Sequence, residues 1–289
     1  MDRLQQAINK AREARDGKEE KNTHRRPSPA EAEPELRSER IERPMPRVAT
    51  DVDARWAEFD MLELNPKDIR RNRLIAHTPG EAAIPFDMLR TKMLQMARKN
   101  DWKRIAIVSP ESGSGKTTIA ANLGLSFSRM RDKRTMIFDF DLRRVGLARV
   151  LGQKCKQSMS AVLERRIPFS QHGLCYESNV VFGLNRERVL NPSELLQNPV
   201  THDVLNEIED QYEPDLMLFD TPPLMVSDDS QGFLESVDCA LLVVAAEKTP
   251  MDRVDVAERQ LSELTNVLGI VLNRCRYTSG AHGYENEYY

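Results

Sequence analysis

The stretch that most constrains this chain is residues 104–127, where an apolar run leads into Ser-Pro-Glu-Ser-Gly-Ser-Gly-Lys-Thr-Thr and then an amphipathic segment. This order predicts a buried strand, a glycine-containing turn and a helix, which is the context of a phosphate-binding loop. Gly113 and Gly115 let the backbone fold around phosphate oxygens, and the helix N-terminus favours negative charge. Lys116 is predicted to reach the β- and γ-phosphates, and the Thr117 hydroxyl to ligate Mg²⁺. We therefore expect the chain to bind a nucleotide.

Composition narrows the class of protein. The 289 residues are 40% hydrophobic and 30% charged, enough for one sizeable core plus a part outside it. A net charge of −3 gives no reason to expect nucleic-acid binding. The four scattered cysteines have no C-x-x-C spacing, which favours a reducing cytosol over disulfides or structural zinc. No signal peptide or membrane-length apolar run is visible, so we expect a cytoplasmic protein that reaches a membrane only through a partner.

The chain divides into four parts by composition. Residues 1–55 are predicted to hold a short helix followed by a disordered, charged tether, because they contain few large apolar side chains. That helix could dock on a membrane partner or lipid, or simply be solvated, and the sequence leaves both open. Residues 56–80 are expected to be a linker that could pack on the domain. Residues 81–276 are expected to be the folded domain, and residues 277–289 an exposed, flexible tail.

From residue 81 the pattern alternates between helix and strand. This predicts an α/β fold: a parallel sheet with helices on both faces. The expected strands are 104–109, 135–139, 179–183, 216–220, 239–245 and 269–273, and the expected helices are 82–98, 116–130, 192–196, 201–212 and 252–264. Ligands of such sheets bind at the carboxyl ends of the strands.

Three carboxylates follow two of these strands. Asp139 and Asp141 follow one apolar run, and Asp220 ends another, in Asp-Thr-Pro-Pro. Carboxylates near a γ-phosphate hold Mg²⁺ and its waters, and a transferase also needs one to accept a proton. The alternative is that each Asp caps a following helix. Three of them beside a phosphate loop favour the nucleotide site.

These motifs resemble those of the bacterial tyrosine kinases, the BY-kinase family. Residues 139–143 are similar to its Walker A′ motif, residues 220–228 to its Walker B region, and residues 237–244 and 267–273 to its later strands. The resemblance covers residues 81–289 and implies a P-loop NTPase-type fold with ATP and Mg²⁺ as cofactors. It also implies an autokinase that phosphorylates its own C-terminal tyrosines. Such proteins act beside an inner-membrane polysaccharide co-polymerase, a chain-length determinant, and regulate exopolysaccharide or capsule export.

The resemblance also implies roles for individual residues. Those implied for nucleotide binding are Gly113, Ser114, Gly115, Lys116, Thr117, Thr118, Asn273 and Arg274, the last two at the adenine. Those implied for catalysis are Lys116, Asp139, Asp141 and Asp220. Among them, Asp139 would be the base or the orienting group for the tyrosine hydroxyl. The metal would be held by Thr117, Asp141 and Asp220.

Tyrosines are concentrated at the C-terminal end. Residues 277–289 hold four of the chain's six tyrosines. This favours a substrate tail, with Tyr284, Tyr288 and Tyr289 as phosphoacceptors and Tyr277, nearest the domain, the least favoured. The alternative is an aromatic tail that packs on the domain or a partner.

The match to the family weakens at three places. Family members carry a Glu-x-x-Arg-x-x-Arg helix that joins subunits into a ring, and here Ile84 and Asp87 precede Arg90 at those positions. The resemblance therefore leaves open a homo-oligomer with an altered interface. Pro110 replaces the first glycine of the phosphate loop, and Val145 replaces a proline after Asp-Leu-Arg-Arg.

Two other functions compete with the kinase. One is a P-loop switch ATPase of the partitioning or iron–sulfur scaffold type. Such proteins usually place a lysine where this chain has Glu111, and the scaffold type has a C-terminal C-x-x-C pair, absent here. The other is a non-catalytic, ATP-binding regulatory subunit of a polysaccharide exporter. The intact Lys116, Asp139 and Asp220 argue against that role.

Overall fold

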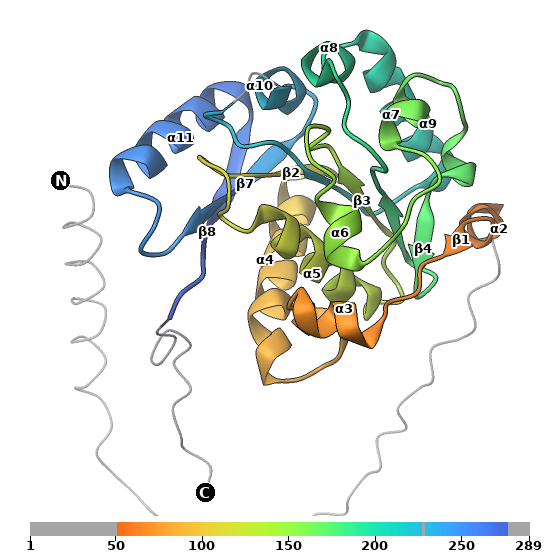
Figure 1. The fold of residues 1–289 in the computed structure, drawn as a ribbon, viewed down its shortest axis with the longest axis horizontal. Coiled ribbons are helices and arrows are strands. Elements are labelled where there is room, and N and C mark those ends of the chain that lie inside the picture. Colours follow the sequence, from red (N-terminus) through yellow and green to blue (C-terminus); the bar gives the residue numbers. More distant parts are fainter. Residues whose placement is uncertain (1–50, 227–228, 277–289) are drawn as a thin grey trace, which may run out of the picture. The chain divides into compact units, whose positions relative to one another are not determined.

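Eight strands form a single sheet in the computed structural model, which describes residues 51–226 and 229–276 (Figure 1). Their order across the sheet is β1-β4-β5-β3-β6-β2-β7-β8. The strands are β1 (Asp60–Met61), β2 (Arg104–Val108), β3 (Thr135–Asp139), β4 (Leu174–Tyr176), β5 (Val180–Gly183), β6 (Leu216–Asp220), β7 (Cys239–Ala245) and β8 (Asn266–Asn273). All neighbouring pairs are parallel except β4 and β5. The predicted α/β fold is confirmed.

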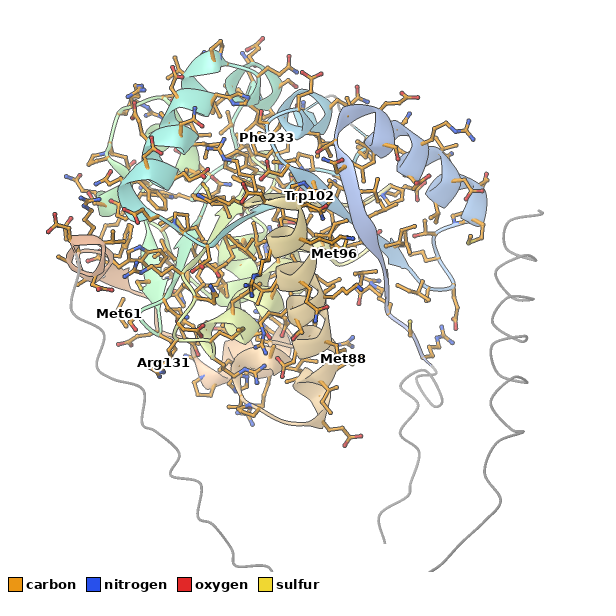
Figure 2. All side chains as sticks on the ribbon, turned by 180° about the vertical axis from the view of Figure 1, so that it is seen from behind. Met61, Met88, Met96, Trp102, Arg131 and Phe233 are labelled. Carbon is orange, nitrogen blue, oxygen red and sulfur yellow. The ribbon has the colours of Figure 1, made fainter. Side chains whose placement is uncertain are left out.

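Helices cover both faces of the sheet. They are α2 (Asp51–Ala57), α3 (Pro66–Arg71), α4 (Ile84–Asn100), α5 (Lys116–Ser128), α6 (Leu147–Leu151), α7 (Met159–Leu163), α8 (Pro192–Leu196), α9 (Pro199–Tyr212), α10 (Asp229–Leu234) and α11 (Met251–Leu264). Helices α4, α5 and α6 pack on one face, and α2, α7, α9, α10 and α11 on the other. Seen from behind, α4 crosses its face with Met88 near its start and Met96 towards its end (Figure 2).

The continuous apolar strands follow from this two-sided cover. Along β2, Ile105 and Ile107 join the core under α4 and α5, whereas Ala106 and Val108 join the core on the opposite face. Successive side chains of a strand point to opposite faces, so a strand covered on both sides needs apolar residues at every position. All four side chains are fully buried.

The antiparallel strand β4 was not predicted. Only residues 177–179 join β4 to β5, too few for the crossover that a parallel connection requires. Glu177 and Ser178 both have positive φ, 52° and 66°. Two consecutive positive φ values are typical of a tight hairpin turn, which usually contains Asn-Gly, so the Glu-Ser sequence gave no local signal.

Residues 51–80, here called the N-terminal strap, pack closely on the domain. The sequence analysis places residues 51–55 in a tether and residues 56–80 in a linker, whereas the strap contains α2, β1 and α3. Trp56 is only 3% exposed, and its Nε1 donates to the Tyr212 carbonyl at 2.8 Å. Phe59 lies edge-on to Trp56 and against Phe169. Apolar burial therefore fixes the start of the strap to the sheet face that carries α9.

The second half of the strap is fixed to α5 by one buried amide. Asn122, which is fully buried on α5, accepts from the Ala76 N–H at 3.0 Å and donates to the Arg73 carbonyl at 3.0 Å. A buried amide that loses such partners costs about 1–3 kcal/mol. The strap is thus held beside the helix that follows the phosphate loop.

Two sets of predictions lie outside the described residues: the helix and tether within residues 1–50, and the tyrosine tail, residues 277–289. Within the described ranges, no helix is both long enough and apolar enough to cross a membrane.

We expect Trp56→Ala to lower the free energy of unfolding by about 3–5 kcal/mol, because it removes a buried aromatic side chain and its hydrogen bond. Met61→Ala is the matched control, since Met61 is in the same strap but 65% exposed. Urea unfolding of both variants measures the difference. Equal stability of Trp56→Ala and the native chain would mean that the strap contributes nothing to the fold.

Candidate nucleotide and phosphoryl-transfer site

The loop between β2 and α5 has the backbone that a phosphate-binding loop requires. Gly113 and Gly115 have φ values of 85° and 93°, in the left-handed region that favours glycine. A Cβ on Gly115 would collide with the Asn273 side-chain amide. Pro110 does not disrupt the loop, since its carbonyl accepts from the Met225 N–H at 3.2 Å.

Asn273 acts on this loop from the end of β8. Its Nδ2 donates to the Ser114 carbonyl at 2.7 Å, and its Oδ1 accepts from the Arg274 N–H at 2.8 Å. Both ends of the amide are therefore engaged within the chain. The contact indicates a clamp on the phosphate loop, whereas the sequence analysis places Asn273 at the adenine.

Lys116 begins α5 and is almost buried, with 6% of its surface exposed. Burial lowers the pKa of its ammonium group, while the nearby carboxylates of Asp220 and Asp141 raise it. The three predicted residues are thus close enough to interact electrostatically. A buried ammonium with partial compensation from carboxylates is suited to an anionic ligand such as a phosphate.

Asp139 and Asp220 are opposite one another at the ends of β3 and β6, and both side chains are fully buried. Asp139 Oδ2 accepts from the Leu147 N–H at 3.0 Å, so this carboxylate does cap α6, as the alternative interpretation holds. Its Oδ1 and both oxygens of Asp220 make no close hydrogen bond within the described part of the chain, although the Asp141 backbone N–H and the Thr117 hydroxyl lie near enough to lower the pKa of Asp139 and of Asp220, respectively. Buried polar groups are rarely left without partners, so these three oxygens indicate a site for a ligand or cation.

The same burial perturbs both carboxyl groups. Desolvation is the largest cause and raises the pKa of Asp139 well above its usual range, and the neighbouring Asp220 raises it further. Desolvation also raises the pKa of Asp220, against the opposing effect of Lys116 and of the nearby Thr117 hydroxyl. Two adjacent buried carboxylates strongly disfavour simultaneous ionisation. A bound cation would allow both carboxyl groups to be ionised at the same time.

Asp141 and Thr117 meet in a cavity of about 220 Å³ beside the loop. Gly113, Gly115, Lys116 and Arg144 also line it. Asp141 is 6% exposed, and burial raises its pKa, with Lys116 and Arg144 acting in the opposite direction. The cavity therefore combines loop backbone, cations and a carboxylate, which is the donor set for phosphates with a magnesium ion.

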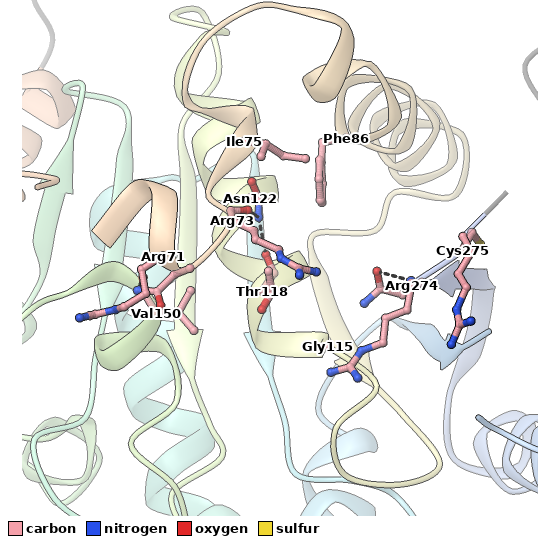
Figure 3. Close-up of a pocket in the computed structure, with 13 residues that line it drawn as sticks. Arg71, Arg73, Ile75, Phe86, Gly115, Thr118, Asn122, Val150, Arg274 and Cys275 are labelled. Atoms are coloured by element: carbon pink, nitrogen blue, oxygen red, sulfur yellow. Dashed lines mark hydrogen bonds between the residues drawn. The ribbon is translucent and has the colours of Figure 1, made fainter. Parts of the chain in front are cut away.

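A second cavity, of about 770 Å³, adjoins the first and shares Gly115, Val150 and Arg274 with it (Figure 3). Thr118 and Asn273 also line it, so of the predicted nucleotide residues these two and Arg274 lie on this side. We assign this cavity to the nucleoside side of the site, because it continues from the phosphate loop. Both cavities open at the carboxyl ends of the strands, as expected for a parallel sheet.

The sequence analysis missed part of the wall of the larger cavity. Arg71, Arg73 and Ile75 come from the N-terminal strap, and Phe86 comes from α4. The only signal in the sequence was the run of three arginines within residues 70–73, which looks like an ordinary solvated surface. The strap's attachment to α5, through Asn122 and the buried Leu74 and Ala76, brings the three strap residues to the site.

An ion pair between half-exposed Arg143 and buried Asp229 joins the segment after β3 to α10. Arg143 Nη2 donates to Asp229 Oδ1 at 2.9 Å, its Nε also bonds this carboxylate, and Ser193 of α8 donates to it. Asp229 is fully buried. The loop that carries Asp141 is thereby tied to the region that follows Asp220.

Helix α4, which the resemblance implies as a subunit-joining helix, makes internal contacts here. On α4, Arg90 donates to the carbonyl and hydroxyl of Ser126 on α5, at 2.5 and 3.0 Å. Asp87 accepts from the Ser126 hydroxyl and from Arg129. Two of the three residues at the motif positions, Asp87 and Arg90, thus contact α5 or the residue that follows it, while Ile84 is exposed. The altered assembly surface stays a prediction.

We expect Asp220→Asn to stabilise the ligand-free chain at high pH. The native carboxyl has a raised pKa, so the unfolded state loses its proton first, and stability falls as pH rises from about 4 through the native pKa. An amide cannot ionise, so the free energy of unfolding of Asp220→Asn should exceed that of the native chain by about 1–3 kcal/mol at pH 8.

This difference should disappear near pH 4, where the native carboxyl is protonated. Thermal denaturation at pH 4, 6 and 8 measures it, with Asp203→Asn, an exposed change on α9, as the control. A loss of stability in Asp220→Asn at pH 8 would mean that attraction to Lys116 outweighs the cost of burial.

Comparison with known proteins assigns the family. The ParA model, described as the NUBPL iron-transfer P-loop NTPase, matches residues 101–289. The putative tyrosine-protein kinase AmsA of Erwinia amylovora is 29% identical over 77% of this chain, which spans 31% of that protein's length. The putative tyrosine-protein kinase CapB of Staphylococcus aureus is 28% identical over 65% of this chain and 82% of its own.

Solved structures share the fold. The chimerical protein CapA2B2 has a TM-score of 0.65 at 23% identity and covers 78% of this chain and 99% of its own. The septum site-determining protein MinD of Pyrococcus horikoshii, complexed with Mg-ADP, has a TM-score of 0.50 at 23% identity over 60% of this chain and 71% of its own. The curated relatives that the chain resembles are named as tyrosine-protein kinases. The family match spans more than half of the chain, which therefore belongs to the ParA family of P-loop NTPases.

Proposed function

We propose that this chain is an ATP-dependent protein-tyrosine autokinase that phosphorylates Tyr284, Tyr288 and Tyr289 and so regulates exopolysaccharide or capsule polymerisation and export. The observation that carries the proposal is the buried pair Asp139 and Asp220, with three unpartnered oxygens, beside Lys116 beneath the phosphate loop. Relatives named as tyrosine kinases and the tyrosine-rich C-terminal segment support it.

The residues fit ATP and Mg²⁺, and their roles follow from their positions. Lys116 and the N–H groups at the start of α5 bind the β- and γ-phosphates. Thr117, Asp141 and Asp220 are oxygen donors for Mg²⁺, which when bound neutralises charge on the transferred phosphoryl group. Asn273 keeps the loop in shape through Ser114.

Asp139 has one unpartnered oxygen, Oδ1, because Leu147 occupies the other. We assign Oδ1 to orient the tyrosyl hydroxyl or to accept its proton. The tyrosyl oxygen then forms a bond to the γ-phosphorus, the bond to the bridging oxygen breaks, and ADP leaves. The raised pKa of Asp139 suits a group that must gain a proton during the reaction.

We place this activity at the cytoplasmic face of the inner membrane, beside a polysaccharide co-polymerase. Support comes from the kinase relatives and from the CapA2B2 chimera, whose fold this chain shares. The proposed nucleotide site is lined by residues of this chain, so the partner's proposed role is to recruit or activate the kinase.

A switch ATPase of the partitioning type is the second candidate. The ParA family match and the fold shared with MinD favour it. Glu111, where those proteins usually have a lysine, and the tyrosine cluster favour the kinase instead. A non-catalytic regulator is the third candidate, and the complete set of acidic and basic groups at the loop argues against it.

We expect Mg·ATP to load phosphate onto Tyr284, Tyr288 or Tyr289 of the full chain, and Lys116→Met to lower this incorporation by at least about 100-fold through lost phosphate binding. Intact-mass and site-mapping mass spectrometry measure it. Lys99→Met is the control, because Lys99 is exposed near the end of α4, where the chain enters the amino end of β2.

Released ADP without phosphotyrosine would contradict the kinase and support the switch ATPase. The absence of both ADP and phosphotyrosine would support a nucleotide-binding regulator. Unchanged phosphate incorporation in Lys116→Met would exclude this loop as the site of transfer.

A further inference from the structure

The larger cavity beside the phosphate loop has an unusual charge. Of the 13 residues that line it, four are arginines, and none is Asp or Glu. The arginines come from two distant segments: Arg71 and Arg73 from the strap, and Arg274 and Arg276 from the end of β8. Such convergence indicates a site for an anionic group.

Two of the four guanidinium groups already have a carboxylate. Arg71 pairs with Asp68 at 2.5 Å, and Arg276 pairs with Glu247 at 3.1 Å. Within residues 51–226 and 229–276, Arg73 and Arg274 have no ion pair. Figure 3 shows their side chains extending toward one another from the strap and from the end of β8. Their charge is available to a ligand.

A nucleotide alone does not account for this charge. Its phosphates belong in the smaller cavity, which Arg274 lines and Arg73 does not. The nucleoside that would extend into the larger cavity is uncharged. Arg73 is nevertheless fixed in place: its φ is 55°, and its carbonyl accepts from buried Asn122. Holding a non-glycine residue in this region costs about 1 kcal/mol or more.

We propose that the larger cavity is a phosphotyrosine-binding site for residues 277–289 of the same molecule, with Arg73 as its principal ligand and Arg274 as the second. The proposal rests on the proposed function, which supplies the phosphorylated tail. Guanidinium groups bind phosphate through paired, charge-assisted hydrogen bonds and are the usual ligands of phosphorylated segments. Glu285 and Glu287 beside the tyrosines add to the charge match.

The chain length allows this folding back. Cys275 and Arg276, which directly precede the tail, line the cavity themselves. Tyr284 is eight residues beyond Arg276, a reach of up to roughly 26–29 Å.

The test uses synthetic peptides, so it needs no kinase activity and separates this proposal from the proposed function. Fluorescent peptides of residues 277–289, with and without phosphate on Tyr284, are titrated with the phosphatase-treated full chain. We expect the phosphopeptide to bind at least tenfold more tightly than the unmodified one. Arg73→Gln should weaken phosphopeptide binding at least tenfold, and Arg73→Lys should weaken it less.

Arg166→Gln is the matched control, because Arg166 is an exposed arginine paired with Glu164 next to α7. Equal binding of the two peptides, or an equal loss in Arg166→Gln, would overturn the proposal. So would a loss in Lys116→Met without one in Arg73→Gln, since the phosphate loop would then be the binding site. An unchanged thermal midpoint for Arg73→Gln confirms that the variant is folded.

A ligated protein tests whether the tail binds its own domain. Cys275 allows native chemical ligation of residues 1–274 to a synthetic segment 275–289 that carries phosphotyrosine 284. We expect this protein to have the mass of a single chain in light scattering and to resist binding of added phosphopeptide at least tenfold. A doubled mass would assign the tail to a second copy and contradict binding within one molecule.

Discussion

The structure depends on the repulsion between two buried carboxylates at the carboxyl ends of two central strands. The pairing of β3 with β6 places Asp139 directly opposite Asp220, out of contact with water, and Lys116, the Thr117 hydroxyl and backbone N–H groups offset their charge in part. A domain without a ligand has no use for such an arrangement, since burial of paired carboxylates costs free energy. The fold therefore gives up stability in the empty state in order to bind a nucleotide and a cation, a common compromise at active sites.

The features that local sequence determines were predicted from the sequence. The apolar runs that became β2, β3, β6 and β7 are continuous because both faces of the sheet are covered, and their ends carry polar residues because ligands bind there. The phosphate loop was recognisable because glycine, lysine and threonine are each required by its chemistry. Asp139, Asp141 and Asp220 were predicted to lie close together because neighbouring parallel strands have their carboxyl ends on the same side of the sheet.

Features that depend on distant contacts were not predicted. The strap has little periodicity, and its place is set by Trp56 against α9 and by Asn122 on α5, contacts between residues far apart in the sequence that leave no pattern in the strap itself. Arg73 reaches the site through that attachment. The sequence analysis assigns Asn273 to the adenine, whereas its amide contacts the Ser114 carbonyl, because a sequence cannot show whether an amide faces a ligand or a loop carbonyl.

The order of the strands also separates the two ends of the domain. The strap enters at β1, one edge of the sheet, and the chain leaves the described domain from β8, the other edge (Figure 1). Seven strand spacings lie between them, roughly 34 Å. The strap and the end of β8 nevertheless line one cavity, through Arg73 and Arg274. That cavity therefore depends on both edges of the sheet, and a change that detaches either edge would remove one of its walls.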